Sequence, residues 1–181
     1  MEKIDNKIIS SEAARVALIF GAISGGYIFV SGALGHMNSA IAGNLISIVL
    51  WVAKFVGCIV LMRFFMKRLQ SSYEGVTRGS LISFGSYIAL FSAIITAACS
   101  YISVQYVFPE QISQTFDMMF QQYSSMLDSN SMAALEQMEG KMGIITMSSQ
   151  LIWCFLYGWI LSSILANNLA GKKDIFDDDD I

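Results

Sequence analysis

Residues 45–65 read LISIVLWVAKFVGCIVLMRFF, an apolar run with a single lysine, Lys54, near its centre. A helix needs roughly 17 to 25 mostly apolar residues to cross about 30 Å of hydrocarbon. Three further runs are long enough, at residues 16–34, 81–107 and 143–165. Because backbone groups in lipid must satisfy their own hydrogen bonds, runs of this length are expected to be helices. The sequence therefore predicts an all-α integral membrane four-helix bundle.

The composition favours a membrane protein over a soluble one. The chain has 181 residues, of which 55% are hydrophobic and 14% are charged, whereas soluble domains contain about 25% charged residues. The polar gaps between the apolar runs are too short for separate domains, so we expect a single four-span domain over residues 1–171. Residues 172–181 form an acidic tail that ends in the Asp177 to Asp180 run and is most simply solvated.

The distribution of lysine and arginine predicts the orientation. These residues precede the first run, surround the connection between the second and third runs, and follow the fourth: Lys3, Lys7, Arg15, Arg63, Lys67, Arg68, Arg78, Lys172 and Lys173. On the opposite side, residues 35–44 contain none and residues 108–142 contain only Lys141. The positive-inside rule then places both termini in the cytoplasm. The first run exceeds the apolar part of a signal peptide, so retention as a membrane anchor is favoured over cleavage.

Small residues recur at every fourth position in three of the four runs, and this spacing predicts where the helices touch. The stripes are Ala13, Ala17, Gly21 and Gly25; Gly85, Ala89, Ala93 and Ala97; and Gly158, Ser162, Ala166 and Ala170. Small side chains allow helix backbones to approach closely in lipid. Since four helices of one chain must pack on one another, we expect these seams to lie within the chain. A homodimer face is the alternative.

The segment between the third and fourth runs, residues 109–141, has helical periodicity of its own. Pro109 is suited to the first turn of a helix, and apolar residues recur at three- and four-residue steps from Ile112 to Leu127. A second amphipathic piece is expected from Met132 into the fourth run, with Ser131 as its N-cap. We expect a short amphipathic helical hairpin that lies on the outer bilayer face or over the bundle. A docking surface for a protein partner is the alternative.

The sequence contains no group of residues that supports enzyme chemistry. Cys58, Cys99 and Cys154 lie in three different apolar runs, and His36 is the only histidine. There is no CxxC pair, no phosphate-binding glycine loop and no pair of carboxylates within the apolar runs. We therefore assign no catalytic, cofactor-binding or metal residues. The cysteines are interpreted as apolar fillers, and His36 as a solvated turn residue, with pH sensing as its alternative role.

Lys54 departs from the pattern of a membrane span. It lies about ten residues from either end of its run, roughly 15 Å along a helix, which is too deep for its side chain to reach the surface easily. Asn44, Ser47, Trp51 and Cys58 share its helical face, so this stripe is expected to point inward.

No Asp or Glu occurs within the four apolar runs, so a carboxylate partner for Lys54 is not available there. Ser24, Ser92 and Thr96 lie at about the same depth in the first and third runs, and Tyr157 does so in the fourth. We expect Lys54, Ser24, Ser92 and Thr96 to form a polar layer inside the bundle. The alternative is a lysine tolerated beside a shallow water defect.

Several short segments resemble one known group of bacterial membrane proteins. Residues 73–79 read YEGVTRG, residues 83–85 read SFG, and residues 108–110 read FPE. Together with the Gly-rich end of the first run and the amphipathic outer segment, these resemble the domain-of-unknown-function family 4199 over nearly the whole chain. The resemblance implies a four-helix inner-membrane protein of a Gram-negative bacterium, and it implies no activity.

Three classes of function remain. A structural or interaction protein of the inner membrane is the first expectation. The second is an oligomeric small transporter or anion channel that uses Lys54, because a four-span chain is small for a transporter on its own. The third is an accessory subunit bound through the outer segment. The expected partners are the lipid bilayer and a second copy or another membrane protein, and no feature indicates nucleic acid.

Overall fold

The computed structural model describes residues 2–35, 40–123 and 128–170, so His36 and the acidic tail lie outside the described residues. Its helices are α1 (Asn6–Gly35), α2 (Ala40–Ser72), α3 (Arg78–Ile102), the π-helix η1 (Ser103–Val107), α4 (Pro109–Tyr123) and α5 (Ser129–Ala170). The predicted all-α class is confirmed. Four helical segments are long and apolar enough to cross a membrane, and they contain the four predicted runs.

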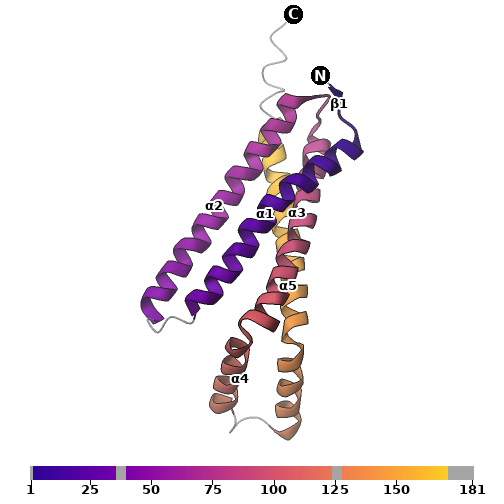
Figure 1. Ribbon diagram of the computed structural model, residues 1–181. Helices are drawn as coiled ribbons and strands as arrows, with labels where there is room; N and C mark the ends of the chain where they lie inside the picture. Colours follow the sequence, from indigo (N-terminus) through magenta and orange to yellow (C-terminus); the bar gives the residue numbers. More distant parts are fainter. Residues whose placement is uncertain (1, 36–39, 124–127, 171–181) are drawn as a thin grey trace, which may run out of the picture.

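Helix α3 lies at the centre of the bundle and packs most extensively against α1 and α5 (Figure 1). On one side, Gly21 and Gly25 of α1 face Ile95 and Cys99 of α3. On the other side, Gly158 of α5 faces Ala89 of α3. A Cβ atom added at Gly158 would lie only 2.5 Å from the Cβ of Ala89, so the missing side chain permits this close approach. The small-residue stripes thus lie between helices of one chain.

Helix α2 lies at the edge of the bundle and is buried over only part of its length. Its second half contributes Cys58, Met62, Met66 and Leu69 to the hydrophobic core. Its first half exposes apolar side chains, including Leu45 and Val49, which are 59% and 66% exposed. In lipid such a surface is an expected bilayer contact. The tightest packing of the bundle is therefore at the end that holds the N-terminus.

The outer segment forms a hairpin whose second arm is continuous with the fourth span. Helix α4 runs beside the first part of α5 (Figure 1). The 42 residues of α5 extend about 63 Å at 1.5 Å per residue, about twice the hydrocarbon thickness. The N-cap predicted at Ser131 is wrong: α5 already begins at Ser129, and the carboxylate of Asp128 accepts a hydrogen bond from the Ser131 backbone N–H at 2.9 Å. An acidic side chain competes well for this cap.

Two aromatic residues of α4 differ in their surroundings. Phe116 is buried, whereas Tyr123, which shares the predicted apolar face, is 43% exposed in the isolated chain. The hairpin is attached to the bundle through α1, because Gln111 Nε2 donates a hydrogen bond to the Gly32 carbonyl at 2.8 Å. The hairpin is therefore anchored at its base.

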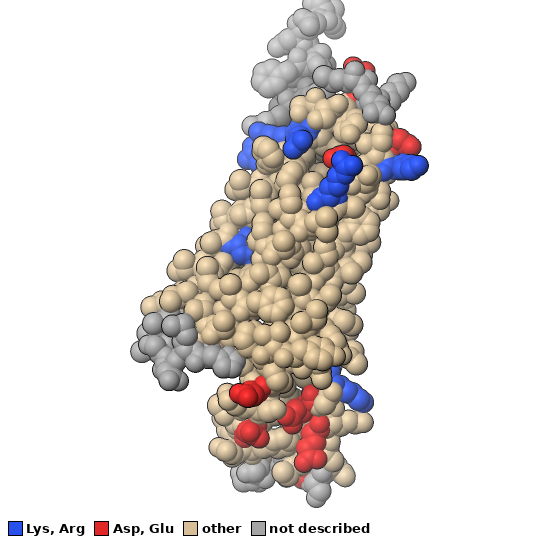
Figure 2. All heavy atoms as spheres, in the orientation of Figure 1, with Lys and Arg blue, Asp and Glu red and all other residues tan. Residues whose placement is uncertain are grey.

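A short parallel bridge brings the N-terminus to the connection between α2 and α3. Strand β1 (Glu2–Lys3) pairs with β2 (Tyr73–Glu74), and Gly75 follows with a φ of 76°, which a glycine adopts without strain. Thr77 then caps α3 by accepting a hydrogen bond from the Ser80 N–H. Lys and Arg gather near this end, and Asp and Glu gather on the hairpin at the other end (Figure 2). Between the two ends lies a largely uncharged band.

Candidate functional site

The candidate site is a cavity of about 480 Å³ between α2 and the other three long helices. All four residues of the predicted polar layer, Lys54, Ser24, Ser92 and Thr96, line it. Each comes from near the middle of its span, so the cavity lies within the band that is uncharged apart from Lys54. The remaining lining is largely apolar and aromatic.

One face of α2 supplies Lys54 to the cavity. Trp51, Lys54, Cys58 and Met62 recur at three- and four-residue steps, and all four line the cavity. This spacing places them on one side of a helix. Lys54 is half-buried, while Cys58 and Met62 are buried where α2 rejoins the core. The cavity therefore begins where α2 leaves its close packing.

The ammonium of Lys54 lies over an aromatic ring. Its Nζ atom is 4.6 Å from the ring centroid of Tyr27, within the range of a cation–π interaction. No hydrogen bond or ion pair to Lys54 occurs within the described part of the chain. Sequence reasoning missed Tyr27, although it lies three residues after Ser24 and so shares its helical face.

The hydroxyl groups of α3 direct their protons to their own helix. Thr96 Oγ1 donates to the Ser92 carbonyl at 2.8 Å, and Ser92 Oγ donates to the Ala89 carbonyl at 3.2 Å. Each hydroxyl oxygen still has lone pairs that can accept a further hydrogen bond. Ser92 and Thr96 thus share the cavity with Lys54 without a hydrogen bond to it. They offer acceptors to a donor on a bound molecule.

Aromatic residues border the cavity on the side where α2 and α5 approach each other. The Phe55 ring centroid of α2 lies 5.3 Å from that of Tyr157 of α5 and 5.6 Å from that of Trp51. Trp51 and Trp153, which line the cavity from α2 and α5, are 54% and 71% exposed. Because these lining residues also face outward, the cavity extends to the lipid-facing surface of the bundle.

This arrangement is suited to binding. It combines one cation, several hydroxyl acceptors and apolar walls, which is the usual make-up of a small-molecule site. Within residues 2–35, 40–123 and 128–170, no three His, Cys, Asp or Glu side chains lie close enough together to hold a metal ion. The site contains no nucleophile activated by a neighbouring base among the described residues.

Comparison with protein families gives a match over most of the chain. A family model described as "Protein of unknown function (DUF4199)" matches residues 15–167. No curated protein and no solved structure matches the chain. The matched range includes every residue that lines the cavity, together with the outer hairpin. This match confirms the resemblance found in the sequence, and the chain belongs to the DUF4199 family of proteins of unknown function.

Proposed function

We propose that the chain is a multi-pass protein of a Gram-negative inner membrane, with both termini in the cytoplasm, that binds a small amphipathic anion around Lys54. The observation that carries this proposal is a mid-span lysine that faces a cavity and has no carboxylate partner among the described residues. The excess of Lys and Arg near the N-terminal end supports the orientation.

The energy of an intramembrane lysine supports an anionic ligand. A lysine at the centre of a span costs about 2.5 to 3.5 kcal/mol on insertion scales. A cation–π contact such as the one with Tyr27 contributes about 0.5 to 2 kcal/mol. The contact therefore offsets part of this cost, and a bound anion supplies the missing counter-charge.

The walls of the cavity indicate the rest of the ligand. Its volume of about 480 Å³ lies within the range of roughly 300 to 1,000 Å³ found for ligand sites. The aromatic and aliphatic lining favours an apolar body, and the single lysine favours one negative charge. A long-chain carboxylate that approaches from the bilayer between α2 and α5 has this chemistry.

Anion binding at Lys54 is also what a transporter or channel that uses this lysine requires. A four-span chain offers few helices for a transport route, so transport by this chain requires an oligomer. Catalysis has no support in the residues around the cavity, and we propose that the protein is not an enzyme.

Tryptophan fluorescence offers a direct test, because two of the three tryptophans, Trp51 and Trp153, line the cavity. The purified chain in nanodiscs is titrated with 9,10-dibromostearate, whose bromine atoms quench nearby indoles. We expect saturable quenching in the unmodified protein. The apparent affinity for the fatty acid is expected to fall at least about tenfold in Lys54→Met, because the counter-charge is lost. Lys67→Met removes a lysine from the same helix outside the cavity and serves as the control.

The neutral methyl ester of the same fatty acid separates charge recognition from partition into lipid. We expect the ester to quench no better in the unmodified protein than the acid does in Lys54→Met. Equal quenching by acid and ester, or by acid in the unmodified and Lys54→Met proteins, contradicts the proposal.

An interaction protein is the second candidate, and the outer hairpin is the observation that favours it. Met118, Met119, Tyr123 and Met138 are exposed there, and methionine-rich surfaces adapt to partners. Mass determination in nanodiscs tests this candidate. A stable dimer or larger assembly that Met118→Ser disrupts supports it, and a strict monomer without a protein partner contradicts it.

A further inference from the structure

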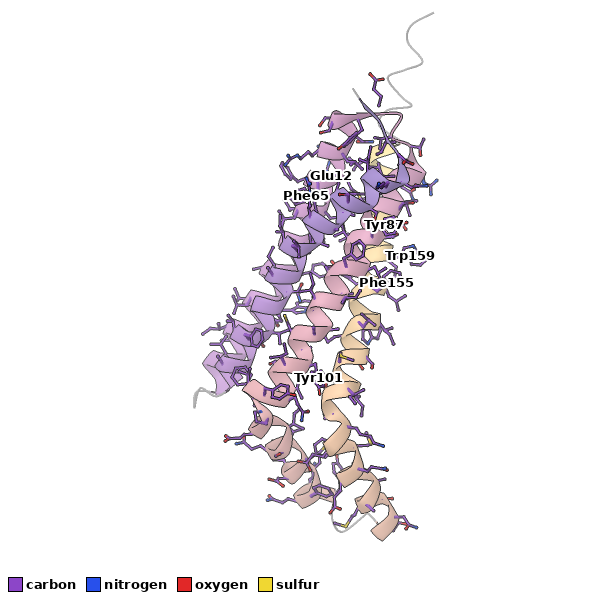
Figure 3. The ribbon with its side chains drawn as sticks, turned by 45° about the vertical axis from the view of Figure 1, so that its right-hand side comes forward. Glu12, Phe65, Tyr87, Tyr101, Phe155 and Trp159 are labelled. Carbon is purple, nitrogen blue, oxygen red and sulfur yellow. The ribbon has the colours of Figure 1, made fainter. Side chains whose placement is uncertain are left out.

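A second cavity, of about 340 Å³, lies between α1 and α2 near the N-terminal end of the molecule. Glu12 and Arg15 line it from α1, and Phe65 and Arg68 line it from α2. Figure 3 shows Glu12 and Phe65 close together at this end of the two helices. None of its lining residues also lines the cavity around Lys54.

The lining of this cavity changes from polar to apolar along the helix axes. Arg15 comes directly before the apolar run of α1, and Val16 and Ile19 continue the lining into that run. On α2, Phe65 ends the apolar run and Arg68 lies about one turn beyond it. The guanidinium groups therefore lie at the level of the membrane interface, and the apolar lining lies on the hydrocarbon side.

The charges of the cavity leave one guanidinium available. Arg15 Nη1 lies 3.4 Å from Glu12 Oε1, and the Arg15 side chain is 77% exposed. Arg68 lines the same cavity and forms no ion pair with another described residue. A guanidinium presents a planar set of N–H donors that matches the oxygen atoms of a phosphate group. Ser72 and Tyr73 add hydroxyl groups at the polar end.

We infer that this cavity binds the phosphodiester headgroup of a glycerophospholipid from the leaflet at the end of the bundle that holds β1. Arg68 and Arg15 hold the phosphate, and one acyl chain lies along Ile19 and Phe65. Basic pockets between transmembrane helices at the interface are suited to lipid headgroups. The site is independent of the cavity around Lys54, so either site can be correct without the other.

The test uses native mass spectrometry of the full chain in detergent, titrated with dioleoyl phosphatidylglycerol. We expect the double variant Arg15→Gln/Arg68→Gln to lose about tenfold more affinity than Arg63→Gln/Lys67→Gln. The control pair removes the same net charge from α2 alone, outside the cavity. Equal losses in the two double variants indicate diffuse attraction and overturn the inference.

Two further measurements test the same site without the double variant. Glu12→Gln frees Arg15 from its carboxylate partner, so we expect tighter phosphatidylglycerol binding. Unchanged or weaker binding by Glu12→Gln overturns the inference. Inorganic phosphate is expected to displace the bound lipid only weakly, because it has no acyl chain to contact the apolar lining. Displacement of the lipid by an equimolar concentration of phosphate shows a free-anion site and overturns the assignment to a lipid.

Discussion

Lys54 is the only Lys, Arg, Asp or Glu residue between Val16 and Met62. In the structure its ammonium lies over the ring of Tyr27. Helical spacing could predict that Lys54 shares one face of α2 with Trp51 and Cys58, because residues at three- and four-residue steps lie on one side of any helix. It could not predict the contact with Tyr27, because the long lysine side chain has several rotamers that reach different neighbours. Its position over the ring depends on the tertiary placement of α1 beside α2.

The Tyr27 contact predicts different outcomes for two substitutions. Tyr27→Phe keeps an aromatic face beneath the ammonium, whereas Tyr27→Leu removes it. We expect the leucine variant to be about 0.5 to 2 kcal/mol less stable than the phenylalanine variant, as measured by thermal unfolding in detergent. The difference is expected to disappear in a Lys54→Met background. Equal stability of the two variants with Lys54 present contradicts the contact.

Asp128 gives a pH-dependent prediction at the start of α5, outside the apolar part of the helix. Hydrogen bonds from the Ser131 side chain and backbone lower the pKa of its carboxyl group from the ordinary value of 3.8. Because this pKa is lower in the folded chain, the cap stabilises α5 fully above pH 3.8 and is lost as the pH falls through the folded-state pKa.

Carbon-13 NMR of the Asp128 carboxyl group measures this pKa. We expect a midpoint below 3.8 that rises toward 3.8 in Ser131→Ala, because the side-chain hydrogen bond is the largest cause of the shift. A midpoint at or above 3.8 in the unmodified chain contradicts the assigned cap.

At the scale of the elements, α1 and α5 each pack closely on α3, while α2 is partly separate. The four-residue spacing of small side chains could predict that Gly21, Gly85 and Gly158 lie on helix seams. It could not predict which helix pairs with which, because the same stripe suits any neighbour. The hairpin shows a similar limit. Periodicity predicted a second amphipathic piece that runs into the fourth span, as α5 does. It placed the N-cap at Ser131 instead of Asp128, because both side chains suit a cap and spacing does not choose between them.

Two matched glycine substitutions test the seam between α3 and α5. Gly158→Ala places a methyl group against Ala89, including its backbone Cα at 3.3 Å, so the helices must move apart. We expect a loss of about 1 to 3 kcal/mol in thermal unfolding experiments. Gly26→Ala is the control, because its added methyl group has no neighbour within 4 Å. Its higher helix propensity predicts unchanged or slightly greater stability. Equal stability of the two variants contradicts the packing.

At the scale of the whole molecule, the two ends differ in charge: Lys and Arg gather near the N-terminal end, and Asp and Glu gather on the hairpin. The tight packing of α2 lies at the N-terminal end. The lysines and arginines near the N-terminus could be predicted to share one side of the membrane from their positions relative to the apolar runs. The cavities could not be predicted in the same way. Their volumes depend on how far α2 diverges from its neighbours, and periodicity carries no information about that separation.

The proposed orientation is tested by cysteine labelling in intact cells of a host whose outer membrane has been permeabilised. A membrane-impermeant maleimide is expected to react with Glu136→Cys, on the hairpin, and not with Ser72→Cys, at the other end. Both positions are exposed in the folded chain. Because Ser72 borders the second cavity, labelling of Ser72→Cys after the inner membrane is also permeabilised serves as the control that its thiol is reactive. Labelling of Ser72→Cys alone reverses the orientation and contradicts the proposal.

The binding role of Lys54 is tested most directly by an experimental structure of the chain in lipid nanodiscs with stearate present. We expect elongated density in the cavity between α2 and α5, with its polar end about 3 Å from Lys54 Nζ. Tyr27 is expected to remain on the opposite side of the ammonium. A closed bundle with α2 packed along α3, or an empty cavity with the Lys54 ammonium directed into the bilayer, contradicts the proposal.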